Sequence, residues 1–136
     1  MNTAGYSGTP LLQKLGIKPE MKILTLNPPQ NYFQLLQSDI SGQYVSPNEI
    51  PDFIHLFAET NTIFKNEMKK VLQISKMKSS AVIWVSWYKK TSGMATDLTE
   101  DLIRNFALEN NLVDIKVCAV SNEWSGLKLV VPVSKR

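Results

Sequence analysis

Residues 81–100 read AVIWVSWYKKTSGMATDLTE, and the segment divides into a strand, a polar loop and the start of a helix. Its first seven residues are mostly β-branched or aromatic and alternate little, which is typical of a strand covered on both faces. Asp97 stands three residues before Glu100 and apolar residues follow, a spacing that predicts a capped helix start. Strand, loop and capped helix make up half of a β-α-β unit.

The same kinds of element are predicted on both sides of this segment. Apolar periodicity and turn residues predict helices at residues 11–15 and 32–36, from Thr60 or Thr62 to about 77, and at 97–110. Strands are predicted at residues 21–26, 53–57, 114–120 and 127–131, with a weak one at 43–45. This order predicts one α/β domain over residues 1–136, a three-layer sandwich with a mostly parallel sheet that ends in an antiparallel strand pair.

The terminal antiparallel pair narrows the fold prediction. A parallel α/β sheet that ends in this way resembles the Rossmann-like fold of methyltransferases, in which the last strand inserts beside the preceding parallel strand. The resemblance implies that residues 127–131 lie between residues 81–87 and residues 114–120. It is a resemblance of architecture, and a fold does not determine an activity.

Composition excludes several classes of function. A net charge of +3 is too small to indicate nucleic-acid binding, and no apolar run approaches the roughly 20 residues of a membrane span. Cys118 is the sole cysteine, so an internal disulfide is excluded and a reducing compartment is the simplest expectation. The N-terminus lacks the basic and then apolar pattern of a signal peptide. We therefore expect a cytoplasmic protein that binds neither nucleic acid nor membranes.

Several segments together resemble an uncharacterised bacterial family, domain of unknown function 3052. They are GYSGTPL (5–11), KLGIK (14–18), WVSW (84–87), TDLTED (96–101), VCAV (117–120) and WSGLKL (124–129). The resemblance spans nearly the whole chain and implies a small stand-alone bacterial protein, but no activity, because none is assigned to that family. One departure is Tyr88, where members of the family often carry proline, and this affects only the expected shape of the loop.

The carboxyl ends of the parallel strands indicate where a ligand would bind, because open α/β sheets bind ligands beyond those ends. The turn before the last strand should lie at the same edge. The candidate ligand-binding residues are Asn27, Glu59, Trp87, Lys89, Lys90, Ser92 and Trp124, with Thr60 and Glu123 beside them. Two exposed tryptophans beside two lysines would suit an anion or an aromatic ligand. The alternative is that Trp87 and Trp124 pack together as core and the lysines are solvated.

The sequence argues against a conventional methyl-donor site and predicts no cofactor. S-adenosylmethionine is held by a glycine-rich turn after the first strand and by an acidic residue that ends the second. The first turn here, LNPPQNY (26–32), has no glycine, and residues 43–46 include no acid. Prolines also lack the N–H donors that a nucleotide would use. His55 lies within a predicted strand and Cys118 within another, so we expect a core imidazole with one hydrogen bond and an inert thiol, and no metal site.

The sequence thus favours a non-catalytic binding module for a small molecule or a protein on a Rossmann-like fold. The alternative is a diverged methyltransferase-like enzyme that uses the same edge. A third hypothesis is that the protein is an oligomer-forming scaffold that associates through an exposed edge strand or the Trp124 turn. The identity of the ligand, any catalysis, the oligomeric state and the pathway are left open by the sequence.

Overall fold

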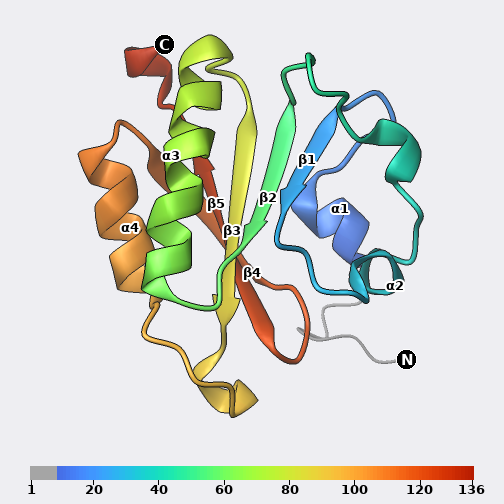
Figure 1. The fold of residues 1–136 in the computed structure, drawn as a ribbon, viewed down its shortest axis with the longest axis vertical. Coiled ribbons are helices and arrows are strands. Elements are labelled where there is room, and N and C mark those ends of the chain that lie inside the picture. Colours follow the sequence, from blue (N-terminus) through green and yellow to red (C-terminus); the bar gives the residue numbers. More distant parts are fainter. Residues whose placement is uncertain (1–8) are drawn as a thin grey trace.

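The computed structural model describes residues 9–136, which form a five-stranded mixed sheet flanked by helices (Figure 1). Residues 5–8, which belong to one of the segments behind the family resemblance, lie outside the described residues. The helices are α1 (Leu11–Leu15), α2 (Tyr32–Leu36), α3 (Asn61–Met77) and α4 (Glu100–Glu109). The strands are β1 (Ile23–Leu26), β2 (Phe53–Phe57), β3 (Val82–Tyr88), β4 (Val113–Ala119) and β5 (Trp124–Val130).

The strand order is β1-β2-β3-β5-β4, so the last strand in sequence lies inside the sheet. β1, β2 and β3 pair in parallel, whereas β5 is antiparallel to both of its neighbours, β3 and β4. This confirms the predicted insertion of the last strand. β5 begins at Trp124 instead of residue 127, because the connection from β4 is a short turn over residues 120–123.

The weak strand predicted at residues 43–45 is reduced to a single parallel bridge. Residues Ser41–Gln43 form a 3₁₀ turn, and only Tyr44 bridges the sheet, opposite Ile23. The segment is too short to extend further, since Pro47 follows almost at once and cannot donate to a ladder.

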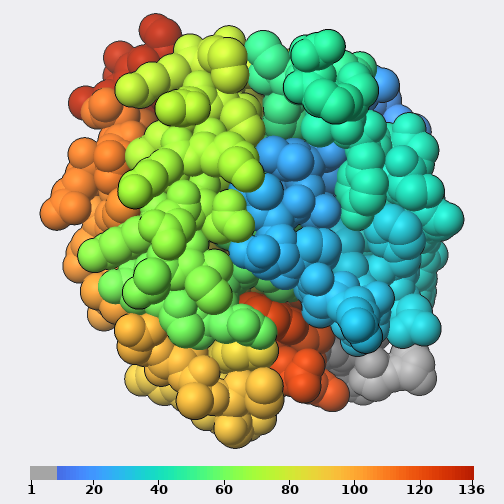
Figure 2. Space-filling model, viewed as in Figure 1, coloured from blue at the N-terminus to red at the C-terminus, as the bar shows by residue number. Residues whose placement is uncertain are grey.

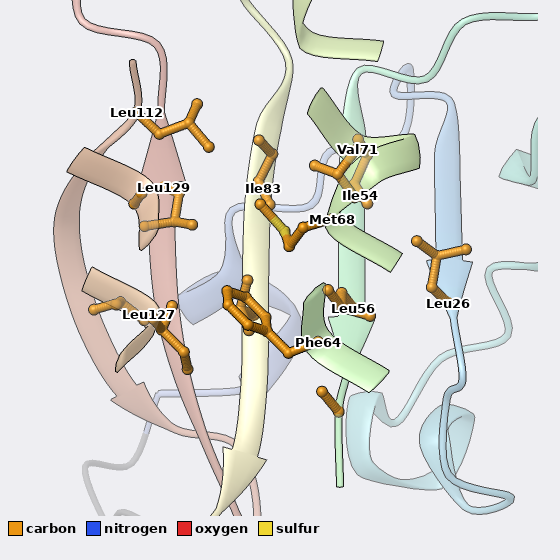
Figure 3. Packing of buried hydrophobic residues seen from close by; sticks show 14 of the residues in the cluster. Leu26, Ile54, Leu56, Phe64, Met68, Val71, Ile83, Leu112, Leu127 and Leu129 are labelled. Atoms are coloured by element: carbon orange, nitrogen blue, oxygen red, sulfur yellow. The ribbon is translucent and has the colours of Figure 1, made fainter. Parts of the chain in front are cut away.

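Apolar side chains cover both faces of the sheet, in two clusters. α3 and α4 pack on one face, where Phe64, Met68 and Val71 lie over β2 and β3 (Figure 3). α1 and α2 pack on the other face, against a cluster that includes Trp84. The Trp84 indole donates a 3.0 Å hydrogen bond to the Leu15 carbonyl, which ties α1 to the central strand.

The caps of the two longer helices differ in part from the prediction. Thr99 caps α4 by accepting from the Leu102 N–H, so the cap predicted at Asp97 is wrong. The Asp97 carboxylate instead accepts a 2.8 Å hydrogen bond from the Asn61 N–H at the start of α3. Asp97 therefore stabilises the beginning of a helix other than its own, which no local sequence pattern could reveal.

Thr60 is the residue that caps α3, since its hydroxyl accepts a 3.1 Å hydrogen bond from the Ile63 N–H. Replacing Thr60 with alanine is expected to lower the free energy of unfolding by about 1 kcal/mol, because that N–H loses its partner. The matched control is Thr62→Ala on the exposed surface of the same helix, with an expected change within about 0.5 kcal/mol. Urea unfolding of both variants measures the difference, and equal losses would contradict the assignment of the cap.

Candidate functional site

The path of the chain changes sides at β1. Ile23 pairs with Phe53 of β2 at one edge of the strand. Tyr44 also pairs with Ile23, so it lies at the opposite edge. After β1 the chain thus passes first to one side of the strand and then returns to β2 on the opposite side (Figure 1). Crevices beyond the carboxyl ends of strands at such a reversal are where open α/β sheets bind ligands.

A cavity of about 540 Å³ lies at this position. It is lined by the residues that follow β1 and β2, the first turns of α3, the end of β3 and the start of β5. Figure 2 shows the red-orange residues before β5 between the green beginning of α3 and the blue end of β1. The lining residues are Asn27, Pro28, Pro29, Phe57, Glu59, Ile63, Asn66, Glu67, Tyr88, Glu123 and Trp124. This volume suits a ligand of metabolite size.

Hydrogen bonds hold two of the polar side chains of the cavity in place. Asn27 adopts a left-handed backbone conformation with φ of 57°, and its amide donates a 3.0 Å hydrogen bond to Glu67. The Tyr88 hydroxyl donates a 3.1 Å hydrogen bond to the Glu59 carboxylate. Burial, followed by the nearby Glu59 carboxylate, raises the pKa of Tyr88. Tyr88 therefore stays a hydrogen-bond donor toward Glu59 at neutral pH.

Aromatic rings form the inner wall of the cavity. Tyr88 and Trp124 stack with ring centroids 4.2 Å apart and an interplanar angle of 27°. Phe57 meets Trp124 edge to face at 5.0 Å. The wall is a firmly packed part of the protein, because aromatic pairs of this geometry stabilise the fold beyond their burial alone.

The structure brings only part of the predicted site together. Asn27, Glu59 and Trp124 line the cavity, with Glu123 beside them. Trp87, Lys89 and Lys90 line a separate cavity of about 550 Å³ against the start of α4. Ser92 lies in the 3₁₀ turn Lys90–Ser92, where its hydroxyl accepts from the Met94 N–H, and it lines neither cavity.

The predicted pair of exposed tryptophans is wrong. Trp124 is directly opposite Tyr88 in the register of β3 and β5, so it lies one residue out of step with Trp87. Neighbouring strand residues point to opposite faces, and the two indoles belong to the two different apolar clusters. Both are buried, at 8% and 6% exposure for Trp87 and Trp124, but they do not pack on each other as the alternative prediction expected.

Sequence reasoning missed Tyr88 and the helical residues of the cavity. Ile63, Asn66 and Glu67 are spaced by three and four residues, so they share one side of the first turns of α3. That spacing, counted from a helix that starts after the end of β2, is a signal that could have identified them.

A chain of buried polar groups lies beside this region but is closed to it. The His55 ring is fully buried and shares 2.8 Å hydrogen bonds with the Tyr32 hydroxyl and the Ser86 hydroxyl. Burial lowers the pKa of His55 to about 3 and raises the pKa of Tyr32. The predicted core imidazole is confirmed, with two hydrogen bonds instead of one. Neutral imidazole satisfies both partners, so the chain supports the fold.

In the part of the chain that the structure describes, no three His, Cys, Asp or Glu side chains are grouped so that they could hold a metal ion. Over residues 9–136, no helix combines the length and the apolar character needed to cross a bilayer.

Comparison with known proteins identifies the fold but no family. No family model matches the chain, so the resemblance to domain of unknown function 3052 has no support from that comparison. No curated protein matches it significantly. The chain is similar to a crystal structure of a protein in the NADB-Rossmann superfamily from Streptococcus agalactiae, with a TM-score of 0.59 and 8% identity. The match covers 90% of this chain and 68% of that one, and it supports a Rossmann-like α/β fold.

Proposed function

We propose that this Rossmann-like domain is a non-catalytic binding module that takes a small molecule into the cavity at the ends of β1, β2 and β3. The observation that carries the proposal is the position of the cavity beyond the carboxyl ends of the parallel strands, with Asn27 after β1, Phe57 of β2 and Tyr88 of β3 in its wall. Among the described residues its lining includes no serine, threonine, cysteine, lysine or histidine, so a nucleophile there would have to be a glutamate or Tyr88.

A diverged methyltransferase-like enzyme is the second candidate; the antiparallel β5 between β3 and β4 resembles the inserted last strand of a three-layer, methyltransferase-like sandwich and supports it. The turn after β1 weighs against it. Pro28 and Pro29 cannot donate hydrogen bonds to a nucleotide, and the left-handed position is occupied by Asn27 instead of glycine. The segment that bridges the outer edge of β1 around Tyr44 carries no acidic residue between positions 41 and 48.

The proposal is tested by nuclear magnetic resonance, using the indole N–H signals of Trp84, Trp87 and Trp124. A panel of nucleotides, S-adenosylmethionine, S-adenosylhomocysteine and small amines is titrated into the labelled protein. We expect at least one compound to shift the Trp124 indole signal, because Trp124 lines the cavity, and to leave the Trp87 signal unchanged. The indole signal that is missing from the spectrum of Trp124→Phe is the signal of Trp124. A panel that never moves it would contradict the proposal.

A thermal-shift titration with the two methyl-donor compounds separates the two candidates. A ligand at 100 times its dissociation constant stabilises the folded state by roughly 2.7 kcal/mol, so binding is readily visible as a raised melting temperature. We expect no shift with either compound, because the proline turn offers no nucleotide-binding donors. A shift with S-adenosylmethionine would favour the enzyme instead.

A further inference from the structure

The cavity carries a charge opposite to that of the protein as a whole. The chain has a net charge of +3, yet the lining residues include Glu59, Glu67 and Glu123 and no lysine, arginine or histidine. A concave site lined by one sign of charge concentrates ligands of the other sign. This charge would favour cations over anions, whereas the sequence suggested a site for an anion or an aromatic ligand.

The three carboxylates differ in how far they are already paired. Glu67 accepts from the Asn27 amide and lies 3.8 Å from the Lys70 ammonium. Glu59 accepts only the neutral Tyr88 hydroxyl. In the described range 9–136, the Glu123 carboxylate has no hydrogen-bond or ion-pair partner. Glu59 and Glu123 are thus the two charges left to meet a ligand.

Glu59 follows β2 and Glu123 precedes β5, so the two residues line the cavity from either side of β3. Both carboxylates contribute to the raised pKa of the Tyr88 hydroxyl, so both lie within electrostatic reach of that oxygen. Glu123 is held there by its backbone, which donates 3.1 Å to the Ser121 hydroxyl and accepts 2.9 Å from the Lys89 N–H. The backbone that carries Glu123 is therefore held in position in the folded protein.

Trp124 supplies a polar group that also lacks a partner. The residue is only 6% exposed, and its indole N–H makes no hydrogen bond within residues 9–136. No side-chain nitrogen or oxygen in that range is both fully buried and unpaired. Because Trp124 lines the cavity, its N–H can donate to a ligand bound there.

We infer that the cavity binds a small organic cation, a primary or methylated amine, whose charge lies between Glu59 and Glu123 and whose apolar body lies against Phe57, Ile63 and Trp124. A hydrogen-bond acceptor on that body would meet the Trp124 indole N–H. An organic cation fits better than a metal ion, because the described carboxylates are not grouped closely enough to chelate one and the volume is far larger than an ion requires. The inference rests on the proposed function and specifies the ligand class for the same site.

Three compounds with the same aromatic ring and differently charged side chains test the inference. Tyramine, 4-ethylphenol and 4-hydroxyphenylacetate share a phenol ring, which can accept from the Trp124 N–H, but carry a positive, neutral and negative side chain. Isothermal titration calorimetry at low salt should show tyramine binding at least about tenfold more tightly than 4-ethylphenol, and 4-hydroxyphenylacetate binding more weakly than both. Raising the salt concentration should reduce this difference.

Matched variants locate the charge that is recognised. Glu59→Gln and Glu123→Gln should each weaken tyramine binding by about 3–10-fold and leave 4-ethylphenol binding almost unchanged. Glu20→Gln, an exposed glutamate before β1 at the opposite edge of the sheet, removes the same charge and should change neither affinity. Equal effects of all three variants would show a general charge effect and overturn the assignment to this site.

The remaining outcomes separate this inference from the proposed function. If 4-hydroxyphenylacetate binds as tightly as tyramine and shifts the Trp124 indole signal, the ligand class is wrong but the binding site stands. If no compound of the series binds at millimolar concentration, the ligand class is overturned, and the separate panel that includes nucleotides then decides whether the cavity binds small molecules at all.

Discussion

Replacing Trp124 with alanine is expected to lower the free energy of unfolding by about 3–5 kcal/mol. The indole is 94% buried, stacks on Tyr88 at 4.2 Å and meets Phe57 edge to face at 5.0 Å, so truncation leaves a void under the β4–β5 turn. Such a loss is a large part of the stability of a domain of this size. Urea unfolding followed by circular dichroism measures it as a lower midpoint at an unchanged slope.

Trp124→Phe provides the matched control, because it retains an aromatic ring against Phe57 and Tyr88 while removing the indole N–H. We expect it to lose about 1–2 kcal/mol. An alanine variant as stable as the natural protein would contradict the packing described above. Binding experiments at this position should therefore use the phenylalanine variant, in which a lost affinity is not confused with a lost fold.

Acidification is expected to destabilise the protein over the range in which His55 is protonated only in the unfolded chain. Burial lowers the pKa of His55 from 6.5 to about 3 in the folded state. Between these values the unfolded chain binds a proton that the folded chain excludes, so stability falls as the pH falls through this window. At about pH 5 the loss from this residue alone is about 2 kcal/mol, and it grows toward pH 3. Above pH 6.5 the contribution disappears.

The variant that isolates this effect is His55→Gln. It lowers stability at neutral pH, because the buried hydrogen bonds to Tyr32 and Ser86 are disturbed, but it should flatten the dependence between about pH 7 and pH 5. Hydrogen bonds lower the pKa values of Asp39, Glu49 and Asp52, so the protonation of these carboxylates also lowers stability in acid. Those residues are common to both proteins and cancel in the difference. Parallel curves for the two proteins would show that His55 is not the source.

Local sequence patterns predicted the elements whose formation depends on their own residues. β2 and α2 occur at Phe53–Phe57 and Tyr32–Leu36, as predicted from an apolar run and a short amphipathic segment. Gly16 ends α1 in the left-handed conformation that glycine accepts without strain. These features need no partner elsewhere in the chain to be recognised.

Elements that depend on distant partners were predicted less well. Asp97 lies where a helix cap was expected, but it binds the start of α3, 36 residues away. Position 126 in β5 favours glycine, because a Cβ there would come within 3.2 Å of the Trp84 ring and 3.1 Å of Val120. Both depend on which strands and helices become neighbours, and a single sequence does not state that.

The candidate site divides in the same way. The sequence by itself determined that the ends of β1 and β2 share an edge with the turn before β5, because carboxyl ends of parallel strands meet, and so it identified Asn27, Glu59 and Trp124. The tertiary structure alone decided the charge of the site. The register of β5 against β3 turns Trp87 and Trp124 to opposite faces, which leaves Lys89 and Lys90 with Trp87. Because a shift of one residue reverses the face of every side chain in a strand, only that pairing gave Trp124 acidic neighbours instead of basic ones.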